Sequence, residues 1–284
     1  MTNLRVGVVG LGVMGRRHAE AIARVPEVSY AGAADHTPRN DVLGSQVYGS
    51  VDALMASGLD ACVIATPTPE HVSTTLTLVE AGVHVLIEKP LALDAEECGR
   101  IESAVARAGV VAAVGHVERF HSSVAALAVR LGGGELGPIE SIRTRREGGP
   151  PRHDEGGILL DLGTHDFDLA MWLTGQTYER VSTARLADLP SDAAALVSGS
   201  LSGGVGVEHR LSWRSAERVR DVTVQCGGET LVADTREPGA QDPLQAQLRA
   251  FAELVSGSVE QTSLASVADG RRAVEVAVSA AQTL

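Results

Sequence analysis

Short apolar runs alternate with segments of helical spacing over the first 115 or so residues. The strand-like runs cover residues 4–9, a stretch that ends at 34, then 60–67, 83–90 and 110–115. Between them, apolar positions recur at helical intervals, which predicts helices over 19–25, 51–56, 72–81 and 93–108. Alternating strands and helices are typical of an α/β fold, so residues 1–116 are predicted to form a doubly wound parallel sheet.

The pattern changes from about residue 116 onward. A helix is predicted to run to Arg130, a strand covers 138–147 and helical spacing covers 158–174. Four strand-like runs then follow without helices between them, at 181–186, 193–201, 205–213 and 219–226, and two helices close the chain at 243–255 and 267–281. Successive strands imply antiparallel pairing. We therefore expect residues 117–284 to form an α+β domain on an open, mostly antiparallel or mixed sheet, with the final helices packing back on the first domain.

A glycine motif directly follows the first strand and opens the first helix. It reads Gly10-Leu11-Gly12-Val13-Met14-Gly15. Gly10 permits a tight turn, Gly12 lets the backbone approach a pyrophosphate, and Gly15 allows close packing of helix on strand. A plain tight turn is the alternative. The context of strand, loop and helix favours a Rossmann dinucleotide-binding domain, with Val13 and Met14 in the cofactor-binding loop.

Other candidate cofactor ligands lie at the ends of predicted strands. Asp35 lies 25 residues after Gly10, about where an acid binds the adenosine ribose, although a helix or turn cap is the alternative reading. An aspartate here would repel a 2′-phosphate, so NAD is the predicted cofactor and NADP the alternative. Thr66, Pro67 and His71 follow the 60–67 run, at the carboxyl edge where doubly wound sheets bind ligands.

Lys89 is the only lysine in the chain, against 23 arginines. It ends the apolar run Val85-Leu86-Ile87-Glu88-Lys89-Pro90. Arginine stays protonated in proteins, whereas a partly desolvated lysine can lower its pKa and exchange a proton. We interpret Lys89 as a catalytic amine; an ordinary solvated lysine is the alternative.

A second candidate pair lies in the helical segment 158–174. Asp161 and His165 are four residues apart and would share one helix face. A carboxylate beside an imidazole fixes its tautomer and makes it an effective general acid–base. A helical Asp/His pair considered alone more often makes a structural hydrogen bond. The catalytic interpretation is favoured here only because Lys89 and the glycine motif occur in the same chain.

Charge and cysteine content limit the classes of partner. A net charge of −12 argues against nucleic acid and anionic membranes. The three cysteines are far apart, so neither a disulfide scaffold nor a metal site is expected. No signal-peptide pattern or membrane-spanning apolar run is present in this sequence, and we expect a cytoplasmic protein.

The motifs together resemble one enzyme family. The stretches 10–19, 65–71, 88–92 and 161–166, in this order and spacing, look like the glucose-fructose oxidoreductase / inositol dehydrogenase / MocA (Gfo/Idh/MocA) family, over essentially the whole chain. The resemblance implies that Lys89 hydrogen-bonds the reacting oxygen near the nicotinamide, and that His165, oriented by Asp161, exchanges the proton. Glu88 would help to position the nicotinamide. The sequence does not indicate whether Lys89 or His165 is the principal acid–base group.

One branch of the family is the most similar. Residues 115–120 and 150–152, with the Asp161 segment, resemble the enzymes that oxidise UDP-N-acetylglucosamine or related nucleotide sugars at carbon 3. Glu118, Arg119 and Arg152 are then candidate substrate-binding residues, together with Lys89, Asp161 and His165. The alternatives are an inositol or cyclitol dehydrogenase, a glycosidase that uses transient oxidation by bound NAD, and a non-catalytic dinucleotide-binding regulator. A homodimer or homotetramer is expected by resemblance.

Overall fold

The computed structural model describes all residues except 1–2, 38–42, 150–155, 187–192, 237–238 and 260–261. The chain divides into two compact units. Unit 1 comprises Met1–Val117 and Asp242–Arg271, and unit 2 comprises Glu118–Gln241 and Arg272–Leu284. The sequence had suggested one boundary after residue 116, whereas the second division falls inside the last helix. In the described ranges, no helix combines the length and apolar character needed to cross a lipid bilayer.

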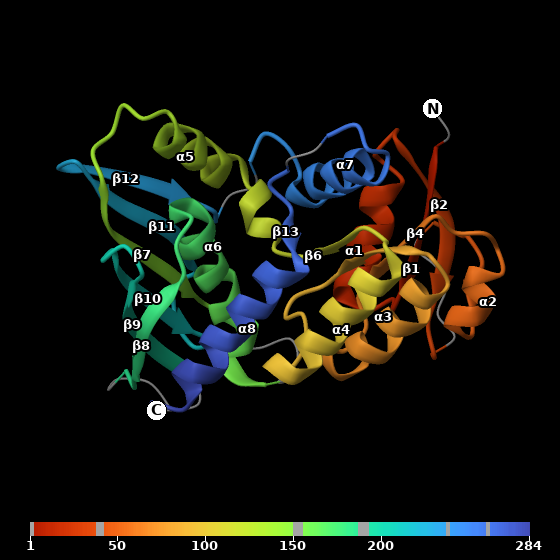
Figure 1. Ribbon diagram of the computed structural model, residues 1–284, viewed down its shortest axis with the longest axis horizontal. Helices are drawn as coiled ribbons and strands as arrows, with labels where there is room; N and C mark the ends of the chain where they lie inside the picture. Colours follow the sequence, from red (N-terminus) through yellow and green to blue (C-terminus); the bar gives the residue numbers. More distant parts are fainter. Residues whose placement is uncertain (1–2, 38–42, 150–155, 187–192, 237–238, 260–261) are drawn as a thin grey trace. The chain divides into compact units, whose positions relative to one another are not determined.

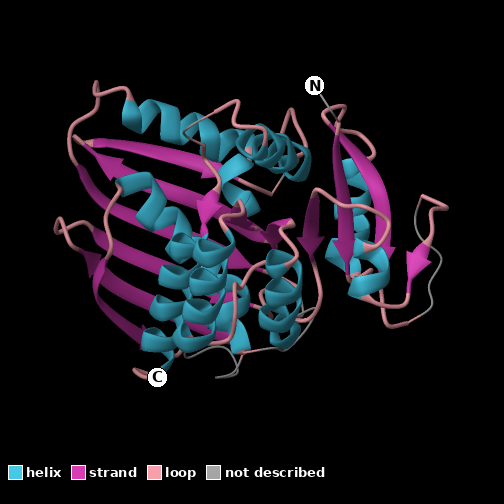
Figure 2. Ribbon diagram, turned by 45° about the vertical axis from the view of Figure 1, so that its right-hand side comes forward, coloured by secondary structure: helices cyan, strands magenta, loops and turns pink. Residues whose placement is uncertain are grey.

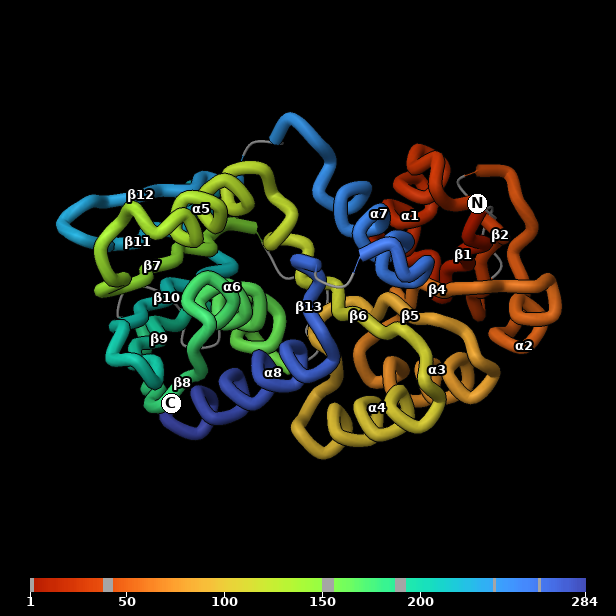
Figure 3. Tube along the Cα trace, turned by 45° about the horizontal axis from the view of Figure 1, so that its top comes forward, coloured from red at the N-terminus to blue at the C-terminus, as the bar shows by residue number. Residues whose placement is uncertain are grey.

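Unit 1 is built on a seven-stranded sheet of order β13-β6-β5-β4-β1-β2-β3. Its strands are β1 (Leu4–Val9), β2 (Val28–Ala34), β3 (Val47–Tyr48), β4 (Ala61–Ile64), β5 (His84–Ile87), β6 (Ala112–Val114) and β13 (Ala265–Ser266). Neighbours from β6 to β3 pair in parallel, and β13 alone joins antiparallel, beside β6 in Figure 3. This doubly wound parallel sheet confirms the predicted Rossmann fold.

Helices with clear end signals connect the strands of unit 1 (Figure 1). They are α1 (Val13–Ile22), α2 (Val51–Met55), the 3₁₀ turn η1 (Thr68–Glu70), α3 (His71–Glu80), α4 (Ala95–Ala108) and α7 (Pro243–Val255). Asp94 caps α4 by accepting the Glu97 N–H at 2.9 Å, and Gly109 ends that helix in the left-handed region with φ 65°. α7 begins with Asp242 as cap and Pro243 at its first turn, and it packs against α1.

Unit 2 is built on a six-stranded sheet of order β12-β11-β7-β10-β9-β8. The strands are β7 (Ile139–Glu147), β8 (Tyr178–Ala184), β9 (Ala194–Leu201), β10 (Gly206–Ser212), β11 (Val219–Cys226) and β12 (Glu229–Asp234). The β7–β10 pair is parallel and every other pair is antiparallel, so the predicted mixed sheet is confirmed. The sequence reading had missed β12, which follows β11 after a two-glycine turn, Gly227-Gly228, with φ 54° and 81°.

One face of this sheet is covered by helices (Figure 2). They are α5 (Ser122–Gly132), after the 3₁₀ turn η2 (Val117–Phe120), then α6 (Thr164–Thr174), after the π-helical turn η3 (Leu159–Gly163), and the part of α8 (Val267–Ala281) that belongs to unit 2. In β7, buried Ile142, Thr144 and Arg146 alternate with exposed Arg143 and Arg145. That period of two places the first set under the helices and leaves a polar outer face.

The core of unit 2 contains a buried polar residue, His209, among apolar neighbours. Its Nδ1 lies 2.8 Å from Thr144 Oγ1 and its Nε2 lies 2.5 Å from the Tyr178 hydroxyl, while the Phe167 ring meets it edge to face at 5.2 Å. Burial lowers the pKa of His209 from 6.5 to about 3. The folded protein therefore holds this imidazole neutral between two hydroxyl groups.

Stability should fall on acidification because of His209. Its folded pKa lies below its unfolded value, so its contribution is complete above pH 6.5 and is lost as pH falls toward 3. Between pH 6.5 and 5, the free energy of unfolding of the wild type should drop more steeply than that of His209→Gln, and the difference in slope should approach about 1.4 kcal/mol per pH unit near pH 5. Urea titrations at each pH measure this, and His36→Gln, at a histidine with an 83% exposed side chain, is the control. Equal slopes for wild type and His209→Gln would contradict the assignment.

Candidate functional site

The glycine loop between β1 and α1 has the shape that a dinucleotide site requires. Gly10 has φ 89°, and a Cβ there would lie 2.6 Å from the Ala65 carbonyl oxygen. A Cβ on Gly15 would overlap the Gly10 carbonyl oxygen, so this glycine lets α1 sit close to β1. Gly12 faces open space. The first and third glycines therefore close the turn, and the middle one leaves room beside the backbone.

The residues around this loop fit NAD on two observations. Gly12 is the N-cap of α1 and gives it no side-chain cap, so the first-turn N–H groups remain for a phosphate. Thr66, just beyond β4, carries a buried Oγ1 without a hydrogen-bond partner. A buried orphan hydroxyl at the carboxyl edge of the sheet is a group that a bound ligand can satisfy. The predicted Pro67 follows it and is the N-cap of η1.

Both carboxylate oxygens of Asp35 accept hydrogen bonds from backbone N–H groups. Oδ2 accepts the Leu11 N–H at 2.6 Å and Oδ1 accepts the Thr37 N–H at 2.8 Å. The alternative reading of Asp35 as a turn cap is thus part of the structure, and the cap holds the glycine loop itself. Each oxygen keeps a second lone pair, so the carboxylate retains capacity for a ribose hydroxyl.

Glu88 is a buried carboxylate immediately after β5. Its Oε1 lies 2.7 Å from His18 Nε2, its Oε2 accepts the Lys89 backbone N–H at 3.2 Å, and its own N–H donates to the Ile64 carbonyl at 2.9 Å. Burial by itself would raise the pKa of Glu88. The hydrogen bond and electrostatic attraction of His18, followed by the Lys89 ammonium, outweigh burial and lower the pKa, so the group is an anion. Lys89 is half-buried beside it.

His18 is the site residue of unit 1 that the sequence reading missed. It lies three residues after Gly15. The apolar residues Ala19 and Ile22 close to it indicated that it lies on the buried face of α1. Nothing local paired it with Glu88, which is 70 residues away in the chain.

His71 is the first residue of α3, and its ring contacts backbone carbonyl groups after β4 and in the segment that carries Lys89. Its Nε2 lies 3.1 Å from the Thr66 carbonyl oxygen, and its Nδ1 lies 3.0 Å from that of Pro90 and 3.3 Å from that of Leu91. Burial lowers its pKa. The contacts tie the end of β4 to the segment that carries Lys89. The predicted contact of His71 with the cofactor stays a prediction.

Asp161 and His165 lie in unit 2 on different kinds of helix. Helical backbone runs through 158–174 as expected, but Leu159–Gly163 has π-helical hydrogen bonding and α6 begins at Thr164. Asp161 Oδ2 accepts the Trp213 indole N–H at 3.0 Å, and His165 is half-buried in the first turn of α6. π-turns within helices often mark functional sites. The catalytic roles of both residues stay predictions.

Arg119 and Glu118 are committed to ion pairs inside unit 2. Arg119 forms a two-pronged pair with Asp168, 2.8 Å from Nε and 2.5 Å from Nη2, and its guanidinium lies 5.4 Å from the centre of the Trp172 ring. Glu118 accepts from Arg146 Nη1 at 2.9 Å. These contacts leave the substrate-binding roles of Glu118 and Arg119 as predictions, and Arg152 lies outside the described residues.

The sequence reading missed the partners of these two residues. Arg146 reaches Asp166 Oδ1 at 3.0 Å through Nη2 as well as Glu118, and it is 3% exposed. Burial raises the pKa of Asp166, whereas Arg146 outweighs burial at Glu118 and lowers its pKa. Only the alternation along β7 hinted that Arg146 points inward.

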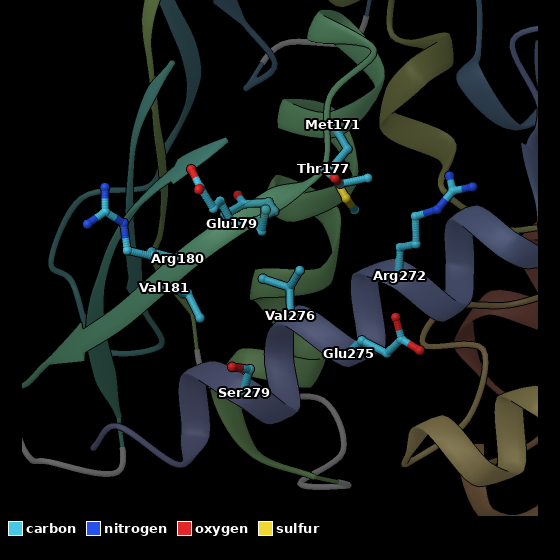
Figure 4. Close-up of a pocket in the computed structure, with 10 residues that line it drawn as sticks. Met171, Thr177, Glu179, Arg180, Val181, Arg272, Glu275, Val276 and Ser279 are labelled. Atoms are coloured by element: carbon cyan, nitrogen blue, oxygen red, sulfur yellow. The ribbon is translucent and has the colours of Figure 1, made fainter. Parts of the chain in front are cut away.

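A pocket in unit 2 lies between β8, α6 and α8 (Figure 4). Its volume is about 390 Å³. Val181 and Val276 face its interior and Arg272 and Glu275 stand on the α8 side. Of the described residues predicted for catalysis or binding, none lines it.

Family models match both parts of the chain. Residues 4–116 match the oxidoreductase family with an NAD-binding Rossmann fold, and residues 124–232 match the GFO/IDH/MocA C-terminal domain.

Three relatives illustrate the range of the family. A UDP-N-acetylglucosamine 3-dehydrogenase of Acidithiobacillus ferrooxidans is 35% identical over 180 residues, which span 62% of this chain and 56% of that enzyme. The rhizopine catabolism protein MocA of Rhizobium meliloti is 30% identical over 311 residues, spanning 100% of this chain and 96% of the relative. An NAD⁺-dependent scyllo-inositol 2-dehydrogenase of Bacillus subtilis is 31% identical over 192 residues, 63% of this chain and 56% of the relative.

The fold of a solved relative covers the chain from end to end. A structure of the Acidithiobacillus ferrooxidans UDP-N-acetylglucosamine 3-dehydrogenase GnnA superposes with a TM-score of 0.84 at 25% identity, covering 100% of this chain and 99% of the other. The predicted family, oxidoreductase class acting on CH–OH and cofactor NAD are confirmed. On these matches, the chain belongs to the GFO/IDH/MocA family of NAD-dependent oxidoreductases.

Proposed function

We propose that this protein is an NAD-dependent dehydrogenase of a nucleotide sugar and that it acts at carbon 3. One observation carries the proposal for the catalytic group: the only lysine of the chain lies half-buried directly after β5, beside the anionic Glu88, at the carboxyl edge of a parallel sheet whose first loop fits a dinucleotide. The similarity to UDP-N-acetylglucosamine 3-dehydrogenase supports the substrate class.

The side chains divide the work of alcohol oxidation. NAD, when bound, supplies the acceptor for a hydride. The Lys89 amine hydrogen-bonds the alcohol oxygen, and either it or His165 takes up the hydroxyl proton as the C–H bond breaks. Asp161 orients the His165 imidazole. The glycine loop and the α1 N-terminus bind the pyrophosphate, and Asp35 binds the adenosine ribose.

A cyclitol is the second candidate substrate, because several relatives are inositol dehydrogenases of similar identity.

A cytoplasmic location and a homodimer or homotetramer stay predictions. Light scattering of the purified protein measures the oligomeric state.

UDP-N-acetylglucosamine should produce NADH with the purified protein, and free sugars and inositols should produce little. The reason is that the nucleotide part adds binding energy that the small polyols lack. The measurement is NADH absorbance across a panel of nucleotide sugars, free sugars and cyclitols. An inositol as the best substrate would replace the first proposal by the second. Turnover of a glycoside without net NADH would indicate the glycosidase.

Lys89→Arg should keep NAD affinity and lose turnover by roughly 10²- to 10⁴-fold, because the positive charge stays while the exchangeable amine is lost. Fluorescence titration gives the affinity, and steady-state kinetics on the best substrate of the panel gives kcat. Arg107→Lys, at an exposed position in the last turn of α4, is the control for an arginine–lysine exchange. Unchanged turnover in Lys89→Arg would remove Lys89 from the mechanism.

Asp35→Ala should weaken NAD binding by roughly 10- to 100-fold, the scale of one charged hydrogen bond, and shift preference toward NADP. The variant also frees the Leu11 N–H, so it loosens the glycine loop. Asp35→Asn is the control, since it keeps an acceptor oxygen but removes the charge that repels a 2′-phosphate. Titrations with NADH and NADPH measure both effects, and a ratio of affinities that does not move would remove the ribose role.

A further inference from the structure

His18 and Glu88 form a buried pair that the proposed reaction does not use. His18 is 1% exposed and Glu88 is 6% exposed. Burying a carboxylate and an imidazole costs several kcal/mol unless each finds partners of good geometry. A pair of this kind in the interior of a Rossmann sheet therefore calls for a role beyond stability.

The Glu88 carboxylate joins helix α1 to the backbone of Lys89. Oε1 meets His18 of α1 at 2.7 Å, and Oε2 accepts the Lys89 N–H at 3.2 Å. The other side of Glu88 is closed by Gly115, where a Cβ would lie 3.1 Å from the Glu88 Cα. The carboxylate thus has one placement, and that placement determines where the Lys89 backbone starts.

The proton of the pair lies on His18 Nε2. His18 Nδ1 is buried and has no hydrogen-bond partner. Because the Glu88 anion can only accept, the hydrogen between the two groups is on Nε2 and His18 donates it. This hydrogen bond from helix α1 is the largest of the interactions that lower the pKa of Glu88 against its burial.

We propose that His18 is a positioning residue for Lys89, acting through the Glu88 carboxylate. This inference rests on the proposed function for the claim that the Lys89 amine serves catalysis. His18 lies in the second turn of α1, whose first turn begins at the glycine loop. The pair therefore links the helix that binds the cofactor's pyrophosphate to the residue that meets the reacting oxygen.

Loss of the His18 donor should change the charge next to Lys89. The titratable groups that act on Glu88 are His18 from α1, Lys89 beside it and His71 from α3. Without His18, burial favours the protonated form of Glu88. The Lys89 ammonium then loses its anionic neighbour, and its amine should give up its proton at lower pH.

The single lysine makes this measurable without turnover. Reductive methylation with ¹³C-formaldehyde places one labelled ε-amine in the whole chain, and the labelled α-amine of the N-terminus is an internal reference. In His18→Leu, the NMR titration midpoint of Lys89 should fall below that of the wild type. His18→Gln, which keeps a side-chain N–H, should restore most of the wild-type midpoint.

Gln247→Leu is the matched control. Gln247 lies on α7, which packs against α1, and it is fully buried with no partner for either amide atom. Its replacement changes buried polarity next to α1 but should leave the Lys89 midpoint unchanged. A shift equal to that of His18→Leu would mean that any repacking of α1 moves Lys89, and would overturn the proposal.

Glu88→Gln keeps the test decisive if His18→Leu does not fold. It should lower the Lys89 midpoint by the same amount, and adding His18→Gln to it should cause no further shift, because both changes act through one carboxylate. A Lys89 midpoint that stays at the wild-type value in Glu88→Gln overturns the coupling. So does an additive shift in the double variant.

Activity separates this inference from the proposed function. On an oxidisable substrate, His18→Leu should lower kcat with NAD affinity retained, and His18→Gln should rescue kcat. If no alcohol is oxidised by the wild type, the proposed function fails while the titration still decides the coupling. If alcohols are oxidised but the titration midpoint of Lys89 is the same in the wild type and in His18→Leu, the coupling fails and the proposed function stands.

Discussion

A carboxylate buried at the carboxyl end of β5 constrains the chemistry-bearing part of unit 1. A charge in that position is costly unless fixed donors surround it. Glu88 obtains them from His18 on α1 and from the Lys89 backbone N–H. His71 on α3 adds a second fixed point by meeting the carbonyls of Thr66, Pro90 and Leu91. Two buried histidines from two helices thus hold one segment of four residues, 88–91.

The glycine loop is also held by a carboxylate from another part of the chain. Asp35 follows β2, yet its carboxylate accepts the Leu11 N–H and so braces the loop that precedes α1. The close contact of Gly15 with Gly10 brings α1 onto β1, and α1 in turn presents His18 to Glu88. The glycine loop, Asp35 and the segment that carries Lys89 are therefore joined by hydrogen bonds and by one helix.

Unit 2 applies buried charge in a different way. Two of its buried arginines are paired with carboxylates: Arg119 with Asp168, and Arg146 with Asp166 and Glu118. Breaking such a pair leaves an uncompensated charge in the interior, which costs more than the intact pair contributes. The pairs tie η2 and β7 to α6, which carries His165 in its first turn. They hold the candidate acid–base helix in one place on the sheet.

The sequence by itself determined the features that depend on neighbours in the chain. Period-two and helical spacing located most elements, the glycine motif located the nucleotide loop, and the single lysine marked the candidate amine. Strand β12 was missed because it is short and only two of its six residues, Leu231 and Ala233, are buried. The π-turn at Asp161 was lost because its residues have ordinary helical spacing.

Only the tertiary structure decided which charges meet. His18 and Glu88 are 70 residues apart, Arg119 and Asp168 are 49 apart, and Arg146 and Glu118 are 28 apart. No local pattern encodes such pairs, since each arises where the sheet order and the helix packing bring two buried polar groups to one place. The interior's low tolerance for an unpaired charge then selects the partner, and that selection is a property of the folded chain.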